Sequence, residues 1–194
     1  MLKAFAEELS LIMVANKIIP IEKRKYYTYG FELILNDILI FTSVSIIAVL
    51  TNTLITSFLF TIVFCVLRAY VGGYHCRSYS ACVFTALTNY ICMLLLNAYI
   101  IHFKLIISLV LIGISIMVIT ILAPVEHENN PLSTTQKKKY KKYSIILIII
   151  ITTGFIISVV FSKLTVSFAI SWAMFAVFLL LLPTIRLERR EKRV

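Results

Sequence analysis

The stretch Leu105-Ile-Ile-Ser-Leu-Val-Leu-Ile-Gly-Ile-Ser-Ile-Met-Val-Ile-Thr-Ile-Leu-Ala123 decides the fold class of this chain. It contains no charged residue and approaches the roughly 20 residues that a helix needs to cross the hydrocarbon core of a bilayer. Five further apolar segments have a similar length, namely 31–50, 54–70, 81–101, 144–161 and 164–183. Because backbone polar groups inside a bilayer must be bonded internally, each segment is expected to be a helix. The sequence therefore predicts an all-α, polytopic membrane protein with six transmembrane helices.

The composition of the whole chain agrees with that class. Of the 194 residues, 60% are hydrophobic and 14% are charged, and the mean hydropathy is +0.97, whereas ordinary soluble proteins have about 25% charged residues. We expect a six-helix transmembrane domain at 31–183, preceded by an amphipathic interfacial segment at 1–30 and followed by a basic cytoplasmic tail at 184–194. Residues 2–19 have the pattern of an amphipathic helix, with Phe5 on its apolar stripe and Ser10 off it, that lies in the membrane interface or packs on the bundle. Pro20 ends this helix, and residues 21–30 are expected to be a basic connector.

The basic residues indicate how the chain is oriented. The formal net charge is +10, and alternating the ends of the six segments puts every lysine and arginine except Lys104 and Lys163 on one side. The positive-inside rule makes that side cytoplasmic, with both termini inside. The clusters Lys137–Lys142 and Arg186–Arg193 flank membrane segments closely, so we expect them to contact anionic lipids of the inner leaflet rather than nucleic acid.

A polar stretch separates two of the apolar segments, Arg68-Ala-Tyr-Val-Gly72-Gly73-Tyr-His75-Cys76-Arg-Ser-Tyr-Ser-Ala-Cys82. Ionisable groups among membrane segments are costly and commonly mark functional sites. Cysteine is a nucleophile and histidine its usual proton acceptor in thiol catalysis, and His75 and Cys82 would share a face if the residues between them are helical. Cys76 is a competing nucleophile, but on a helix it would point about 100° away from His75. We therefore prefer Cys82 as the nucleophile.

The same residues permit other chemistries. A zinc site could use His75, Cys76 and Cys82, although a fourth protein ligand is not evident, and an ion or proton pathway could use Glu32, Asp37, Arg68 and His75. His75 and Cys82 could also serve packing alone. The other two cysteines, Cys65 and Cys92, lie in apolar surroundings and are expected to be reduced, small buried hydrophobes. From the residues alone, these alternatives stay open.

Three motifs in this order resemble the accessory gene regulator protein B (AgrB) family, membrane cysteine endopeptidases of Gram-positive quorum sensing. They are Tyr29-Gly-Phe-Glu32, Arg68-x4-Gly73-x-His75-x6-Cys82, and Ala123-Pro-Val-Glu126 followed by Asn130-Pro131-Leu. The order of the apolar segments also matches, so the resemblance covers most of the chain. It implies a multi-pass enzyme of the cell membrane of a Gram-positive bacterium, with no cofactor and no metal, and a homodimer.

The resemblance also assigns residues and a partner. The catalytic histidine and cysteine of the family fall on His75 and Cys82, and its conserved arginine and glycine fall on Arg68 and Gly73. Family members remove the C-terminal tail of an AgrD-like precursor peptide, hold the remaining peptide as a thioester on the cysteine, and support its cyclisation to a thiolactone or lactone. A small membrane transporter or channel for peptide or ions, without covalent catalysis, is the alternative function.

The remaining predicted site residues have supporting roles. Arg68, Gly72 and Gly73 are expected to form a substrate-positioning or oxyanion region, and the two glycines permit positive φ and the close approach of another chain segment. The candidates to orient His75 are Glu32, Ser78, Ser80 and Glu126. Glu32 is placed at the cytoplasmic edge, where a solvated or arginine-paired role is the default expectation.

Overall fold

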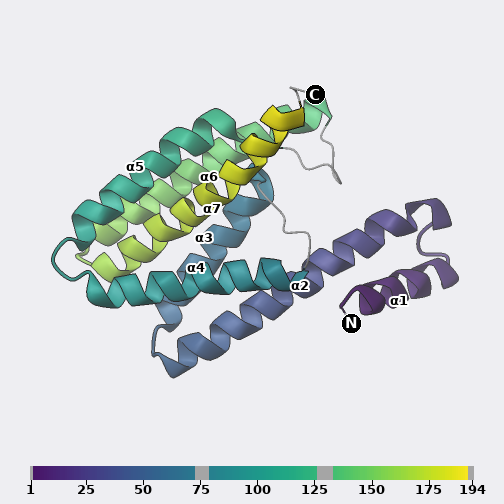
Figure 1. Cartoon of the computed structure of the whole chain (residues 1–194), viewed down its shortest axis with the longest axis horizontal. Helices are drawn as coiled ribbons and strands as arrows, with labels where there is room; N and C mark the ends of the chain where they lie inside the picture. Colours follow the sequence, from purple (N-terminus) through teal and green to yellow (C-terminus); the bar gives the residue numbers. More distant parts are fainter. Residues whose placement is uncertain (1, 73–78, 126–132, 192–194) are drawn as a thin grey trace.

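The computed structural model describes residues 2–72, 79–125 and 133–191, and the side chains of residues 3–72, 81–125 and 133–183. These residues form helices joined by turns, without a strand in the described ranges (Figure 1). The elements are α1 (Leu2–Ala15), the 3-10 helix η1 (Ile21–Lys23), α2 (Arg24–Leu50), α3 (Leu54–Val71), α4 (Tyr79–Tyr99), α5 (Lys104–Leu122), α6 (Thr134–Val160) and α7 (Leu164–Glu191). Six of them, α2 to α7, are long and apolar enough to cross a membrane. The predicted all-α fold with six spans is confirmed.

Helix α7 is the centre of the bundle. It contacts α3, α4, α5 and α6, and its buried residues include the small Ala169, Ala173 and Ala176 beside Phe168 and Met174. Small residues let membrane helices approach closely, so that van der Waals packing holds the bundle together. Helix α2, by contrast, lies at one side of the bundle, where it packs against α3 and α4 (Figure 1).

Short turns make antiparallel hairpins of neighbouring spans, as the sequence predicts. Asn52, with φ of 55°, closes the turn between α2 and α3, and Ser162, with the same φ, closes the turn between α6 and α7. Helix α6 starts with a capping box, in which the side chains of Ser133 and Gln136 each accept a backbone N–H of the other residue. This box satisfies N–H groups that the first turn of a helix leaves without a partner.

Several helices extend beyond the apolar segments that predict them. Helix α2 begins at Arg24 rather than 31, so the expected connector at 21–30 is mostly helical. Helix α6 begins at Thr134 rather than 144, which puts the Lys137–Lys142 cluster on a helix instead of in a loop. Helix α7 runs through Pro183 to Glu191. Hydropathy marks only the apolar part of a helix. Lysine, arginine and glutamine are also good helix formers, so a helix can extend past the end of its apolar segment.

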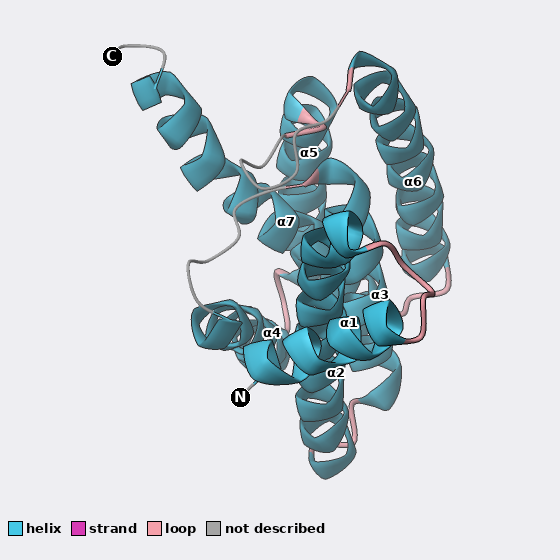
Figure 2. Ribbon diagram, turned by 90° about the vertical axis from the view of Figure 1, so that its right-hand side faces the viewer, coloured by secondary structure: helices cyan, strands magenta, loops and turns pink. Residues whose placement is uncertain are grey.

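The N-terminal helix is shorter than expected and has a different buried face. Helix α1 ends at Ala15, before Lys17 adopts a φ of 55°, and does not continue to Pro20. It lies alongside the N-terminal half of α2 (Figures 1 and 2). Ser10, which the sequence pattern places off the apolar stripe, is fully buried there and accepts a hydrogen bond from the Thr28 hydroxyl at 2.8 Å. The stripe residue Phe5 is instead exposed.

A buried polar contact supports the packing of α3 against α4. Tyr90 is fully buried, and its hydroxyl oxygen lies 2.7 Å from that of Ser57. We expect Tyr90→Phe to lower the free energy of unfolding by about 1 kcal/mol, because the apolar ring stays while the hydrogen bond is lost. Thermal unfolding in detergent micelles measures this change. Tyr99→Phe is the matched control because Tyr99 is 81% exposed, and an equal shift in both variants would contradict the prediction.

Candidate active site

Cys82 lies in the first turn of α4, on the side that faces α2 and α3. It is 8% exposed and is a free thiol. The first turn of a helix carries the positive end of the helix dipole, which favours negative charge nearby. The sulfur is therefore buried in protein yet close to groups that stabilise an anion.

Two hydrogen-bond donors approach the Cys82 sulfur from the two neighbouring helices. Nη2 of Arg68, on α3, lies 3.6 Å from Sγ, and Nδ2 of Asn36, on α2, lies 3.8 Å from it. Donors that face a reacting centre from fixed positions can stabilise negative charge as it develops there. The three helices thus build one polar site around a single sulfur.

Arg68 is held in the last turn of α3. Its guanidinium carbon lies 5.8 Å from the centroid of the Phe64 ring, one turn earlier in the same helix. Asp37, on α2, is exposed on the protein surface. The sequence leaves open whether Arg68 extends to the interface or binds a partner, and the structure directs its guanidinium toward the thiol.

Asn36 is the site residue that the sequence analysis does not identify. It is 3% exposed, and its Oδ1 atom is buried without a hydrogen-bond partner among the described residues. A buried acceptor left without a partner costs about 1–3 kcal/mol. The buried residues of α2 recur every four positions, and they are Glu32, Asn36, Ile40, Val44 and Ala48. This stripe is the signal that could have identified Asn36, because its apolar members share a face with it.

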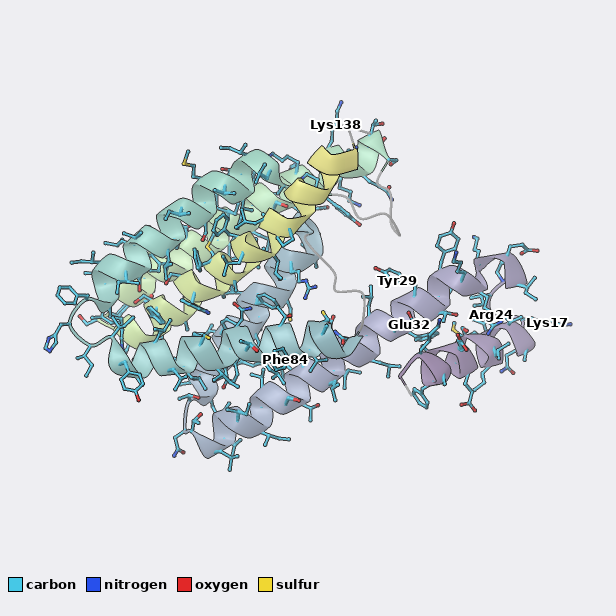
Figure 3. The ribbon with its side chains drawn as sticks, in the orientation of Figure 1. Lys17, Arg24, Tyr29, Glu32, Phe84 and Lys138 are labelled. Atoms are coloured by element: carbon cyan, nitrogen blue, oxygen red, sulfur yellow. The ribbon has the colours of Figure 1, made fainter. Side chains whose placement is uncertain are left out.

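Glu32 begins the same stripe and differs from its expected environment. The sequence predicts that water reaches this carboxylate, but the side chain is only 7% exposed. Figure 3 places Glu32 and Tyr29 on the half of α2 that lies beside α1. The solvated half of the expectation for Glu32 is therefore wrong, and the arginine-paired half stays a prediction.

Gly72 ends α3 in a conformation that favours glycine. Its φ and ψ are 77° and −154°, and a Cβ atom there would collide with the carbonyl oxygen of Val125. The close approach is fixed by a hydrogen bond from the Val125 N–H to the Val71 carbonyl at 3.0 Å. The predicted positive φ is confirmed at Gly72, and the close approach there is that of another segment of the same chain. The segment after α5 is thereby docked beside the end of α3.

An aromatic cluster ties the same end of α3 to α6. The Tyr70 ring centroid lies 6.0 Å from that of Tyr140 and 5.5 Å from that of Tyr143. Lys141, in the same turns of α6, donates a hydrogen bond to the Thr120 carbonyl of α5. These contacts fix the end of the bundle where Arg68 lies.

Several residues of the predicted site lie outside the described residues, namely Gly73, His75, Cys76, Ser78 and Glu126. Ser80 is on α4, but its side chain is not among those described. The pairing of His75 with Cys82 stays a prediction. Two of the three residues of the zinc alternative are in this set. In the described part of the chain, no three His, Cys, Asp or Glu side chains gather as a metal site would require.

The fold and this site define a multi-pass helical membrane protein with a buried cysteine between two hydrogen-bond donors. The family model described as Accessory gene regulator B matches residues 6–182. The chain therefore belongs to the AgrB family, which gives it a role in accessory gene regulator quorum sensing and, as a partner, an AgrD-like precursor peptide. No curated protein and no solved structure matches the chain.

Gly72→Ala tests the docked end of α3. We expect a loss of about 1–3 kcal/mol in the free energy of unfolding, because a side chain disfavours this backbone conformation and displaces Val125. Thermal unfolding measures the loss. Gly154→Ala in α6 is the control, because nothing lies within 4 Å of the added Cβ and alanine favours the helix. A Gly72→Ala variant as stable as the wild type would contradict this account.

Proposed function

We propose that this protein is a membrane cysteine endopeptidase that removes the C-terminal tail of an AgrD-like precursor through a thioester on Cys82. The observation that carries the proposal is the pair of donors, Arg68 and Asn36, on the Cys82 sulfur. If Cys82 served packing alone, a guanidinium and an amide beside its buried thiol would not be required. A channel would need a polar path across the whole bundle rather than one polar site at its end. Acyl transfer needs a nucleophile together with groups that stabilise negative charge.

The first half of the reaction transfers the peptide to the enzyme. His75 takes the proton of the Cys82 thiol, and the sulfur attacks the scissile carbonyl to form a tetrahedral intermediate. The carbon–nitrogen bond then breaks, and His75 returns the proton to the leaving amine of the tail. Arg68 binds the reacting carbonyl or a precursor carboxylate, since its planar guanidinium matches either group. Glu32, buried on the stripe of α2, is a candidate to orient His75.

The second half of the reaction closes the ring. His75 deprotonates a cysteine or serine of the bound peptide, which attacks the thioester carbonyl and frees the Cys82 sulfur. Hydrolysis is the competing reaction and would give a linear acid. Because Cys82 is only 8% exposed, the site limits water and favours the nucleophile that is already held beside the acyl carbon.

The basic end of the bundle fits an acidic tail on the precursor. Lys138 (Figure 3) and Lys142 are exposed in the first three turns of α6, at the end of the bundle that holds Arg68. We assign this end to the cytoplasm by the positive-inside rule. Its charge would also attract anionic lipids of the inner leaflet, where an amphipathic precursor would lie. The homodimer implied by the family resemblance remains part of the proposal.

The thioester is tested by intact mass of the purified enzyme after brief incubation with its co-encoded precursor. We expect a hydroxylamine-sensitive peptide adduct in the wild type and in Cys76→Ala, and its absence in Cys82→Ala and His75→Ala. An adduct that is lost in Cys76→Ala and kept in Cys82→Ala would identify Cys76 as the nucleophile instead. Binding without an adduct or tail release in any sample would favour the transporter or channel.

Charge reversal tests the role of the basic end. We expect Lys138→Glu with Lys142→Glu to slow tail cleavage at low salt by about tenfold, because long-range attraction raises the rate of encounter with an acidic peptide. The initial cleavage rate over a range of salt concentrations measures the effect. Lys163→Glu is the matched control, since Lys163 is exposed in the turn between α6 and α7 at the opposite end of the bundle. Equal effects of the two changes, or none, would exclude this role.

A further inference from the structure

Asn36 has an environment that its packing role leaves unexplained. The other deep positions of its stripe, Ile40, Val44 and Ala48, are apolar, as expected for a helix that packs inside a membrane. Asn36 is 3% exposed, bonds the Cys82 sulfur through Nδ2, and keeps its Oδ1 buried without a partner among the described residues. An apolar side chain would avoid the unpaired acceptor, so the amide is unfavourable for folding alone.

The position of Nδ2 fits the oxygen of an acylated cysteine. In the tetrahedral intermediate, the oxyanion is bonded to the carbon that is bonded to Sγ, so only two bonds separate the oxygen from the sulfur. A donor that lies 3.8 Å from Sγ is therefore within reach of the place where the oxyanion forms. Nη2 of Arg68, at 3.6 Å from Sγ, reaches the same region from α3. Oxyanion sites in acyl transfer use such preorganised donors, asparagine amides among them.

We propose that Asn36 is a catalytic residue that binds the reacting peptide through both atoms of its amide. Nδ2 donates a hydrogen bond to the oxyanion, and Oδ1 accepts the backbone N–H of the residue that supplies the scissile carbonyl. This inference rests on the proposed acyl transfer through Cys82. Both hydrogen bonds of Asn36 go to the same substrate residue. Together they hold its scissile carbonyl in a fixed position relative to the Cys82 sulfur.

The two functions of the amide follow from its chemistry. A side-chain amide carries a donor and an acceptor on one rigid plane, and the C=O and N–H of one residue of an extended peptide point to the same side. When the substrate is absent, Nδ2 bonds the sulfur, and Oδ1 has no hydrogen-bond partner among the residues that the structure describes. When the carbonyl is attacked, negative charge moves from the sulfur to the oxygen, and Nδ2 follows it over a short distance. In the complex, Oδ1 of Asn36 accepts a hydrogen bond from the backbone N–H of the substrate.

The test compares acylation with alkylation of the same thiol. Asn36→Leu is expected to lower the single-turnover rate of thioester formation by about 100- to 1,000-fold, as for loss of one oxyanion donor. Alkylation of Cys82 by iodoacetamide, in a background where the other cysteines are serine, forms no oxyanion and should change by less than about fivefold. Asn36→Ala serves as a second variant if the leucine side chain disrupts folding.

The matched control is Asn89→Leu. Asn89 is on α4, the helix of Cys82, but its Nδ2 donates to the Thr85 carbonyl within that helix, away from the Cys82 sulfur. Acylation and alkylation should both keep their wild-type rates in this variant. Equal losses of acylation and alkylation in the Asn36 variants would show that Asn36 only maintains the fold around the sulfur. An unchanged acylation rate would overturn the inference while leaving the proposed function intact, and a wild-type enzyme without an adduct would overturn the proposed function itself.

The Oδ1 contact is tested with a synthetic precursor that is N-methylated at the residue supplying the scissile carbonyl. The methyl group removes the N–H that Oδ1 would accept. Wild-type enzyme should bind this peptide roughly tenfold more weakly than the unmodified one, whereas Asn36→Leu should bind both equally. Binding is measured with Cys82→Ala in both backgrounds, so that no reaction occurs. If N-methylation weakened binding equally with Asn36 present and in the Asn36→Leu variant, Oδ1 would not be the group that accepts this N–H.

Discussion

The hydrocarbon core of a bilayer cannot hydrogen-bond to protein, and this constraint organises the whole molecule. Backbone groups are satisfied inside helices, which leaves the polar side chains of the membrane segments to find partners within the bundle or at its ends. Hydroxyl groups such as that of Ser108 bond to a carbonyl of their own helix. The Cys82 sulfur is instead bonded by side chains of two other helices. The buried site thus depends on contacts between helices.

The bundle separates a scaffold from a site. Helix α7 packs against α3, α4, α5 and α6, which fixes α3 and α4 relative to each other and so fixes Arg68 near Cys82. The end of α3 is held further by the contact of Gly72 with Val125 and by the tyrosine cluster with α6. Helix α2 lies outside this scaffold and delivers Asn36 along a stripe whose other end is apolar. The apolar part of the stripe packs against the bundle and holds the polar end in place, while the opposite face of α2 is left for lipid.

Different parts of the structure could be predicted to different extents. The turns at Asn52 and after α4, and the existence of six spans, follow from apolar runs that the bilayer requires. The apolar runs do not predict that α2 starts at Arg24 or that α6 starts at Thr134. Hydropathy marks the limits of the segment inside the hydrocarbon core, whereas a helix continues as long as its backbone hydrogen bonds continue. The burial of Ser10 likewise depends on α1 packing along α2, which the periodicity of α1 alone leaves open.

The sequence by itself determined the class of the protein and the number of its spans, and it marked Arg68 and Cys82 as candidate site residues, since bilayer thickness and the cost of polar groups in lipid act on local stretches of chain. Only the tertiary structure decided that Asn36 reaches the sulfur. Asn36 and Cys82 are 46 positions apart, and α2 carries other polar residues that face elsewhere, among them the exposed Asp37. Which of them points at the thiol depends on the rotation of α2 against α3 and α4, and helix rotation is set by packing between helices rather than by any local pattern.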